Sequence, residues 1–156
     1  MLLVFASFSW RADYHALPDR VASHFDTNGD PNGWMTKDHF LALNVALVGL
    51  AALVGLLPPF LVAKVPPALI NLPNKAYWLA PERHAETVSF FVLWFGWFAC
   101  ALLIFVARIM YLVFLANVSS TFRLPGRQFI FDLVGFLVLT AVFVIAMIRK
   151  FSRTGS

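Results

Sequence analysis

Three polar residues in one short segment have the spacing of the first ligands in a calcium-binding loop. Asp26, Asn28 and Asp30 alternate with single intervening residues, as do the first oxygen ligands of an EF-hand. Such a loop also needs glycine at its sixth position and an acidic bidentate ligand at its twelfth. The corresponding residues here are Pro31 and Lys37. Because the strongest ligand is missing, the pattern argues against calcium.

A transition metal is the second chemical possibility in the same segment. His15, His24 and Asp26 carry donor atoms suited to such an ion. Local spacing brings together only His24 and Asp26, and the simpler interpretation is that both hydrogen-bond to neighbouring turn amides. We therefore predict no metal site and no cofactor.

No other pattern predicts catalysis. The chain contains no glycine-rich phosphate loop, no nucleophile placed beside a base, and no His-x-x-x-His or Cys-x-x-Cys motif. The single cysteine, Cys100, lies inside an apolar run, so an intrachain disulfide is excluded. We predict that the protein is not an enzyme.

The composition predicts a membrane protein. Of the 156 residues 60% are hydrophobic and 13% are charged, and the mean hydropathy is +0.77. A soluble domain carries about a quarter charged residues. The chain is therefore predicted to be one all-α, multi-pass membrane domain over residues 1–156. The net charge of +4 is too small and too dispersed for nucleic acid, and membrane lipids are the expected contacts.

The apolar stretches predict three full transmembrane helices, at residues 39–62, 87–117 and 129–148. Residues 1–16 begin with an apolar run only half as long as a span, without the features of a signal peptide. They predict a short half-span helix that enters one leaflet.

Two details of the first span bear on its packing. Pro58 and Pro59 are predicted to end or kink it, since proline has no N–H to donate. Ala51 and Gly55 form a small-xxx-small pair. Such a pair either permits close contact with another helix or reflects only the usual composition of membrane helices.

Residues 17–38 are predicted to form a small, turn-rich head. Residues 21–26 have the pattern of a strand, and residues 28–29 and 30–33 have those of two turns. Gly33 is expected to need a positive φ. Thr36 is the predicted N-cap of the first span.

The head holds the first set of candidate binding residues. These are Arg20, His24, Asp26, Asp30 and Trp34. Trp34 has an amphipathic ring suited to the headgroup layer. A head of this kind either recognises a partner or simply caps the helices.

Residues 63–86 are a polar connector in which Pro66, Pro67 and Pro73 exclude a continuous helix. Pro81 suits the first turn of the next helix. Tyr77 and Trp78 are predicted to anchor the connector at the membrane interface. The candidate binding residues of the connector are Asn74, Lys75, Tyr77 and Trp78. An ordinary anchoring loop is the alternative.

Two charges interrupt the second and third spans. Arg108 lies ten residues before Val118, and Asp132 lies six residues after Gly126. If the two helices are antiparallel, these depths are about 15 Å and 9 Å, which an arginine side chain bridges. We predict an intramembrane ion pair between Arg108 and Asp132. The alternative is that each side chain reaches the interface alone.

The head resembles that of small bacterial membrane proteins with the signature L-P-x-R-[IV]-x-x-H-F-[ND]-x-x-G-x-P-[DN]-G-W-x-[ST]-K. The matching residues are Leu17, Pro18, Arg20, Val21, His24, Phe25, Asp26, Gly29, Pro31, Asn32, Gly33, Trp34, Thr36 and Lys37. Residues 71–83 resemble a second signature of this family of unknown function. The same domain forms the N-terminal half of SdpI-type immunity proteins, which protect bacteria from a secreted membrane-active toxin and can relay its presence to a repressor. The resemblance implies a membrane setting and an immunity-like role.

Basic residues are the guide to orientation. The connector and C-terminus carry six, which are Lys64, Lys75, Arg83, Arg149, Lys150 and Arg153. The other side carries five, which are Arg11, Arg20, Lys37, Arg123 and Arg127. The resemblance implies a bacterial cytoplasmic membrane protein, and this majority predicts that the head lies outside and that the connector and C-terminus lie in the cytoplasm.

The function expected from these features is a non-enzymatic membrane binding module that recognises an extracytoplasmic peptide, lipid or protein. A structural accessory subunit of a larger membrane complex is the alternative, favoured by the small size and by the small residues of the first span. A membrane enzyme acting on lipid is the third possibility, with His24, Asp26 and Asp30 as its candidate residues.

Overall fold

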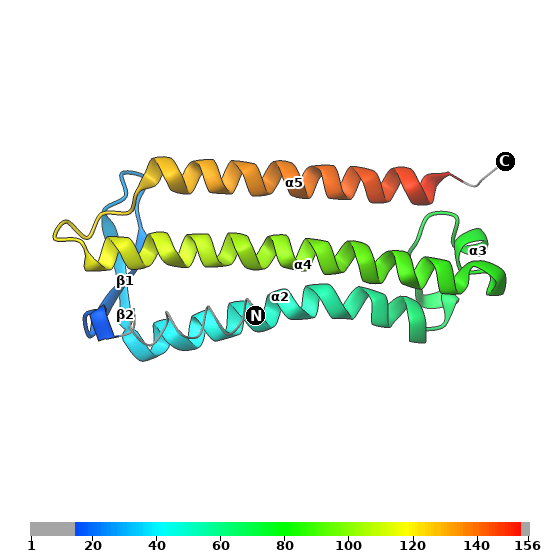
Figure 1. The fold of residues 1–156 in the computed structure, drawn as a ribbon, viewed down its shortest axis with the longest axis horizontal. Coiled ribbons are helices and arrows are strands. Elements are labelled where there is room, and N and C mark those ends of the chain that lie inside the picture. The colour runs from blue at the N-terminus through cyan, green and yellow to red at the C-terminus, as the bar shows by residue number, and fades with distance from the viewer. Residues whose placement is uncertain (1–14, 154–156) are drawn as a thin grey trace. The chain divides into compact units, whose positions relative to one another are not determined.

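The computed structural model describes residues 15–153. The half-span helix predicted for residues 1–16 therefore lies, except for its last two residues, outside the described residues. The order of elements is β1 (Arg20–Phe25), β2 (Pro31–Thr36), α2 (Lys37–Lys64), the 3-10 helix η1 (Pro67–Leu69), α3 (Lys75–Trp78), α4 (Pro81–Val118) and α5 (Gly126–Ser152) (Figure 1).

Three of these helices, α2, α4 and α5, are long and apolar enough to cross a membrane. This indicates a multi-pass membrane protein. Each helix is longer at both ends than the span predicted for it. The predicted spans followed the apolar residues, whereas helical backbone hydrogen bonds continue through the polar residues on either side.

Local signals mark where two of these helices start. The N–H of His39 donates to Thr36 Oγ1 at 3.3 Å, so the predicted N-cap of α2 is confirmed. Pro81 is the first residue of α4, with Glu82 beside it in the first turn, as predicted. Both signals act over three or four residues, which is why the sequence displays them.

The prediction that Pro58 and Pro59 end the first span is wrong, because α2 continues through both to Lys64. Two prolines remove two amide donors, yet the amides of later residues go on bonding. Val65 donates to the carbonyl of Leu61 at 2.9 Å. Membrane helices tolerate proline in this way.

The contacts of the chain group into two compact units. The head unit comprises Met1–Leu47 and Phe105–Leu133, and the connector unit comprises Val48–Ile104 and Val134–Ser156. Each of the three long helices contributes to both units. The two units are described separately below.

The head unit contains a two-stranded antiparallel sheet, so the prediction of an all-α fold is wrong at this point. Residues 30–33 do not form a turn, because β2 begins at Pro31. A proline at the first residue of a strand costs no ladder hydrogen bond. A bulge follows Ala22 in β1, and Val21 and Ala22 are both fully buried.

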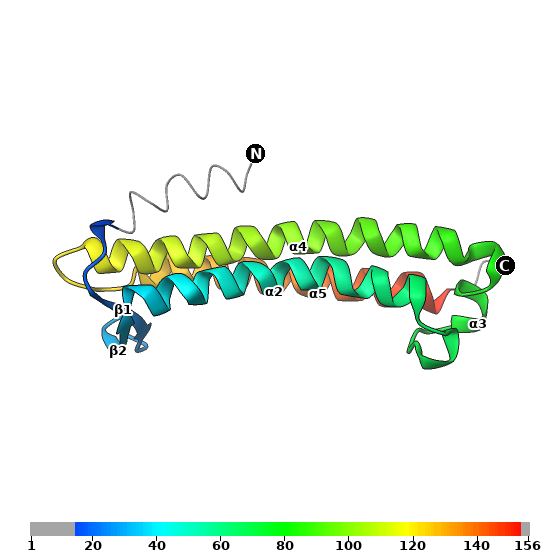
Figure 2. The same cartoon turned by 90° about the horizontal axis from the view of Figure 1, so that it is seen from below.

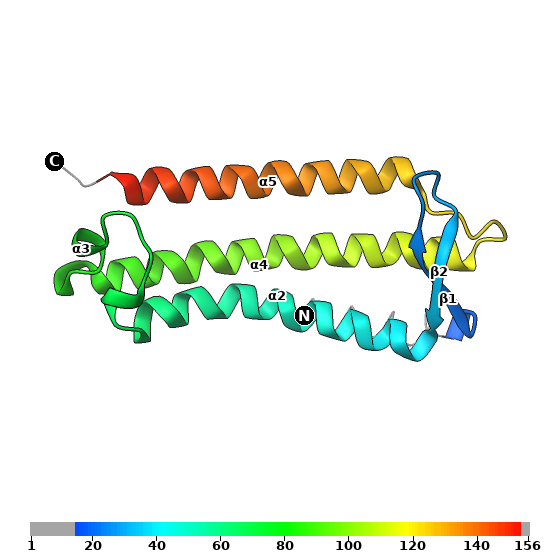
Figure 3. The same cartoon turned by 180° about the vertical axis from the view of Figure 1, so that it is seen from behind.

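The hairpin packs on the part of α4 that belongs to the head unit. The buried apolar residues at this contact are Leu17, Val21 of β1, Phe40 of α2 and Val113 of α4. Figure 3 shows both strands beside the loop that joins α4 to α5. The head is thus built from segments that are distant in the chain. Ala22 and Asn117, which are hydrogen-bonded to each other, lie 95 residues apart.

The connector unit has its own core. Its buried residues are Val62, Trp78, Leu79, Phe91 and Phe151. Figure 2 shows the connector between α2 and α4 folded into a compact loop that contains α3. The predicted interface anchor Trp78 is therefore a core residue, only 9% exposed, because Phe151 of α5 covers its ring at 5.3 Å.

Close contact between α2 and α4 is present in the connector unit. A Cβ added at Gly55 would lie 2.8 Å from the Cβ of Ala99, and Ala51, one turn earlier, is fully buried. The small-xxx-small pair is therefore used to bring these two helices together.

Candidate functional site

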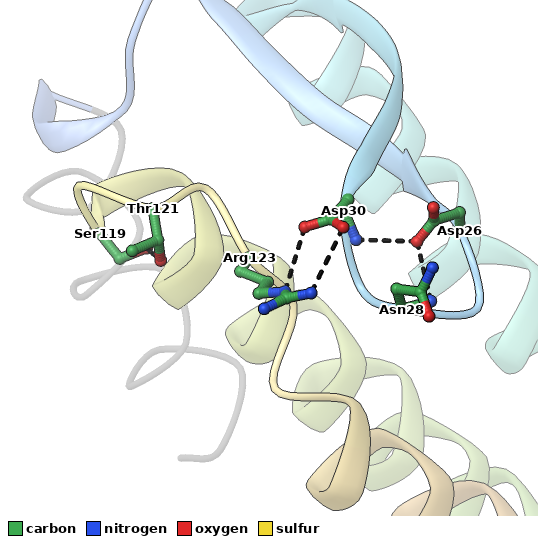
Figure 4. Close-up of polar contacts among 6 residues, drawn as sticks. All are labelled: Asp26, Asn28, Asp30, Ser119, Thr121 and Arg123. Carbon is green, nitrogen blue, oxygen red and sulfur yellow. Dashed lines mark hydrogen bonds and ion pairs between the residues drawn. The ribbon is translucent and has the colours of Figure 1, made fainter.

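The turn of the hairpin is organised by Asp26. Its Oδ1 atom accepts the backbone N–H of Asn28 at 2.8 Å and that of Asp30 at 2.9 Å (Figure 4). Gly29 has a φ of +84° and donates its N–H to the carbonyl of Asp26. One oxygen of Asp26 is therefore committed to the turn, as short acidic side chains often are in this position.

The turn is bonded to the α4–α5 loop at two points. The N–H of Leu124 donates to the carbonyl of Gly29 at 2.9 Å. Arg123 pairs with both oxygens of Asp30, Nε with Oδ1 at 3.1 Å and Nη2 with Oδ2 at 3.3 Å (Figure 4). Two parallel bonds of this kind fix the relative orientation of both side chains.

Asn117 of α4 holds the other edge of the hairpin. Its Oδ1 accepts the N–H of Ala22 at 2.7 Å, and its Nδ2 donates to the carbonyl of Ala22 at 2.9 Å. Nδ2 also donates to the carbonyl of Val113 at 2.9 Å. Asn117 is 3% exposed, so one buried amide completes the ladder edge of β1 as a neighbouring strand would. The sequence analysis missed this residue.

Gly33 has a role different from the predicted one. Among the described glycines only Gly29 has a positive φ, so the expected positive φ at Gly33 is wrong. A Cβ at Gly33 would instead lie 2.9 Å from the Cβ and 3.0 Å from the Nδ1 of His24, its partner across the ladder. Gly33 leaves the space in which the ring of His24 lies.

Three of the five candidate residues of the head are exposed. Arg20 and His24 are exposed on β1, and Trp34 on β2 is 43% exposed. Ser23 Oγ lies 3.1 Å from His24 Nδ1. The ring of Trp34 packs on Phe122 of the α4–α5 loop, with centroids 5.6 Å apart. The structure thus places an arginine, a histidine and an aromatic ring on one small hairpin.

The candidate metal ligands do not assemble into a site. Asp26 serves the turn, and Asp30 is paired with Arg123. Within residues 15–153 no group of three or more His, Cys, Asp or Glu side chains is placed to hold a metal ion.

The candidate residues of the connector belong to the other unit and have mostly structural partners. Asn74 Nδ2 and Trp78 Nε1 both donate to the carbonyl of Phe151, at 3.0 and 3.1 Å. These bonds satisfy a carbonyl in the last turn of α5, where helical donors run out. Lys75 Nζ donates to the carbonyl of Ala68 at 3.2 Å.

His84 bonds a carbonyl in the last turn of α2 in the same way. In a continuing helix the carbonyl of Val62 would accept a hydrogen bond from the N–H of residue 66, but Pro66 has no N–H. The Nε2 atom of His84 lies 3.0 Å from that oxygen and donates to it when the ring proton is on Nε2. The sequence signal was present in Pro66, although it did not reveal which donor would replace the missing one.

The structure brings Arg108 and Asp132 together within the head unit. Arg108 Nη2 lies 3.1 Å from Asp132 Oδ2. The ring of the exposed Tyr111 lies 6.0 Å from the guanidinium carbon.

A family described as Domain of unknown function (DUF1648) has a model that matches residues 1–50. No curated protein and no solved structure matches the chain. The matched range includes both strands of the hairpin and the first half of α2, but none of α4. The similarity therefore covers the hairpin without Asn117, the residue that fastens it to α4.

Proposed function

We propose that the protein is a non-enzymatic membrane binding module whose hairpin presents Arg20, His24 and Trp34 to a peptide, lipid or protein outside the membrane. The observation that carries this proposal is the double attachment of the hairpin. Asn117 bonds one edge and Arg123 bonds the turn, while those three side chains are left exposed. A rigid scaffold that displays arginine and tryptophan is typical of binding surfaces.

Charge positions along the helices support a head at the membrane surface. Residues 87–107 of α4 and 133–148 of α5 are uncharged. At helical rise these stretches are about 32 Å and 24 Å long, close to the hydrocarbon thickness of about 30 Å. Arg108 and Asp132 stand at the end of each stretch. We therefore place both at one surface of the bilayer, shallower than the depth expected from the sequence alone. The hairpin then belongs to the headgroup layer and the water beyond it.

We propose that the protein lies in a bacterial cytoplasmic membrane, with the head outside and the C-terminus in the cytoplasm. It rests on the majority of basic residues in the connector and C-terminal segment. In this orientation the head meets secreted molecules. The resemblance to toxin-immunity proteins favours a membrane-active peptide as the partner.

The two other functions considered have less support. The accessory-subunit alternative drew on the small residues of α2, but Gly55 uses that face against Ala99 of the same chain. A lipid-modifying enzyme would need His24, Asp26 and Asp30 to converge. Asp26 and Asp30 are instead bonded to the turn and to Arg123.

Site-specific photocrosslinking in living cells tests the proposed function. A photoreactive residue in place of His24 should give one discrete adduct, and Trp34→Ala should abolish it. Ser89, an exposed residue in the connector unit, is the matched control position. Adducts that are the same from both positions, or that survive Trp34→Ala and Arg20→Ala, would contradict a binding surface on the hairpin.

A further inference from the structure

Within the part of the chain that the structure describes, the cations of the connector unit have no carboxylate partner. Its basic residues are Lys64, Lys75, Arg83, Arg149, Lys150 and Arg153, and its acidic residues are Glu82 and Glu86. Over residues 15–153, the three ion pairs found all lie in the head unit, where they use Lys37, Arg108 and Arg123. The positive charge of the connector unit is therefore left for a group outside the chain to neutralise.

Aromatic rings hold two of these cations in place. The guanidinium carbon of Arg83 lies 4.0 Å from the ring centroid of Tyr77. Lys150 Nζ lies 4.8 Å from the ring of Trp78 and 4.7 Å from that of Phe90. Such contacts order a cation without cancelling its charge.

The two cations belong to one cluster. Tyr77 and Trp78 contact each other edge to face with centroids 5.0 Å apart. The indole N–H of Trp78 is bonded to the carbonyl of Phe151, next in the chain to Lys150. The connector therefore ties the cation-bearing ends of α4 and α5 to the same pair of rings.

The cluster lies where membrane helices meet headgroups. Arg83 is in the first turn of α4 and Lys150 is in the last turn of α5, and both helices are candidate spans. Basic and aromatic side chains at such ends face the phosphate layer of the bilayer. We propose that Arg83 and Lys150, held on Tyr77 and Trp78, bind the phosphate of an anionic phospholipid.

The surface beyond the cations favours a phospholipid over free phosphate. Leu93 and Trp97 of α4 follow Arg83 along the chain and are 58% and 71% exposed. An acyl chain covers such side chains, whereas inorganic phosphate does not. The guanidinium supplies two donors to phosphate oxygens, and the ammonium adds a point charge.

Native mass spectrometry of the detergent-purified protein tests this site with phosphatidylglycerol and phosphatidylcholine as probes. Phosphatidylglycerol should bind more tightly, and the preference should fall as salt is raised. Arg83→Gln and Lys150→Met should each weaken it about fivefold, the share of one cation near an anionic surface. Arg127→Gln, which removes an exposed cation of the head unit, is the control and should leave the preference unchanged.

Three outcomes would overturn the site. These are equal binding of both lipids, an equal loss from Arg127→Gln, and displacement of phosphatidylglycerol by equimolar inorganic phosphate. Lys150→Arg keeps the charge and should keep the preference, which separates charge from packing. If Lys150→Met melts at a lower temperature in zwitterionic detergent, Arg83→Gln alone decides the outcome, because Arg83 lies outside the buried core.

Discussion

Arg108 donates from Nη2 and from Nε to the same oxygen of Asp132, Oδ2, at 3.1 and 3.3 Å. The arrangement joins α4 to α5 within the head unit. The exposed fractions of the two side chains are unequal, 46% for Arg108 and 19% for Asp132. The carboxylate of Asp132 has less contact with solvent, so losing the ion pair should cost it more free energy than the guanidinium of Arg108.

This inequality predicts the result of a double-mutant cycle. Arg108→Gln should lower the free energy of unfolding more than Asp132→Asn, because it leaves the less exposed charge without its partner. The coupling energy should be about 1 kcal/mol, since a half-exposed pair is worth less than a buried one. Unfolding by denaturant in detergent measures all four proteins. Additive losses would show that the pair contributes nothing.

The amide of Asn117 should matter more than any charge of the head. Asn117→Ala leaves the buried N–H and carbonyl of Ala22 without partners. The expected cost is about 1–3 kcal/mol, with faster hydrogen exchange of the Ala22 amide. Asn32→Ala, at an exposed position on β2, is the control and should change neither quantity. Unchanged exchange at Ala22 in Asn117→Ala would mean that the hairpin is stable without α4.

The two glycines of the hairpin should respond differently to alanine. At Gly29 the new Cβ would meet the Leu124 carbonyl oxygen at 2.7 Å, and the φ of +84° is unfavourable in addition. At Gly33 the three atoms nearest to the new Cβ all belong to the side chain of His24, and the φ is not positive. Gly29→Ala should therefore be the more destabilising change, by about 1 kcal/mol or more. Equal thermal stabilities in detergent would contradict the docking of the turn on the α4–α5 loop.

Local features of the fold were predictable from the sequence, and long-range ones were not. The cap at Thr36, the proline start of α4 and the Asn28-Gly29 turn each depend on a few adjacent residues. Asn117 acts on Ala22 from 95 residues away. Nothing in the sequence near either residue indicates the partner.

The same reasoning explains the site residues whose roles changed. Trp78 is of a residue type that often anchors a chain at the membrane interface. It is a core residue here because the ring of Phe151, which is distant in the sequence, packs on its ring. Gly33 stands in a turn-like sequence, but its space is needed by His24 across the ladder. The exposed residues of the hairpin could be proposed from their types, whereas the attachment that makes them a surface could not.

Proline at position 66 predicts a conditional role for His84. His84→Ala removes the donor to the carbonyl of Val62 and should cost about 1 kcal/mol. Pro66→Ala supplies an N–H at the position from which a helix would normally bond that carbonyl. The loss from His84→Ala should therefore be smaller in the Pro66→Ala background. Equal losses in both backgrounds, measured by unfolding in detergent, would show that His84 stabilises the connector in some other way.

The orientation of the chain can be tested by labelling single cysteines in whole cells with an impermeant thiol reagent. Cys100→Ser provides the background, since this is the single cysteine of the chain. Asn28→Cys places a thiol at an exposed position in the hairpin turn, where only the backbone of Asn28 is bonded to Asp26. Ala76→Cys is the matched position in the connector, because Asn74 is bonded to Phe151 whereas Ala76 is exposed.

Asn28→Cys should react in intact cells, and Ala76→Cys should react only after the membrane is made permeable. The three candidate spans and the excess of basic residues in the connector and C-terminus are the physical grounds for this result. Reaction of Ala76→Cys but not Asn28→Cys in intact cells would show that the chain has the opposite orientation. The head would then face the cytoplasm, and a secreted peptide could not be its partner. Reaction of both in intact cells would contradict the placement of α2 as a span, since α2 separates the two positions in the chain.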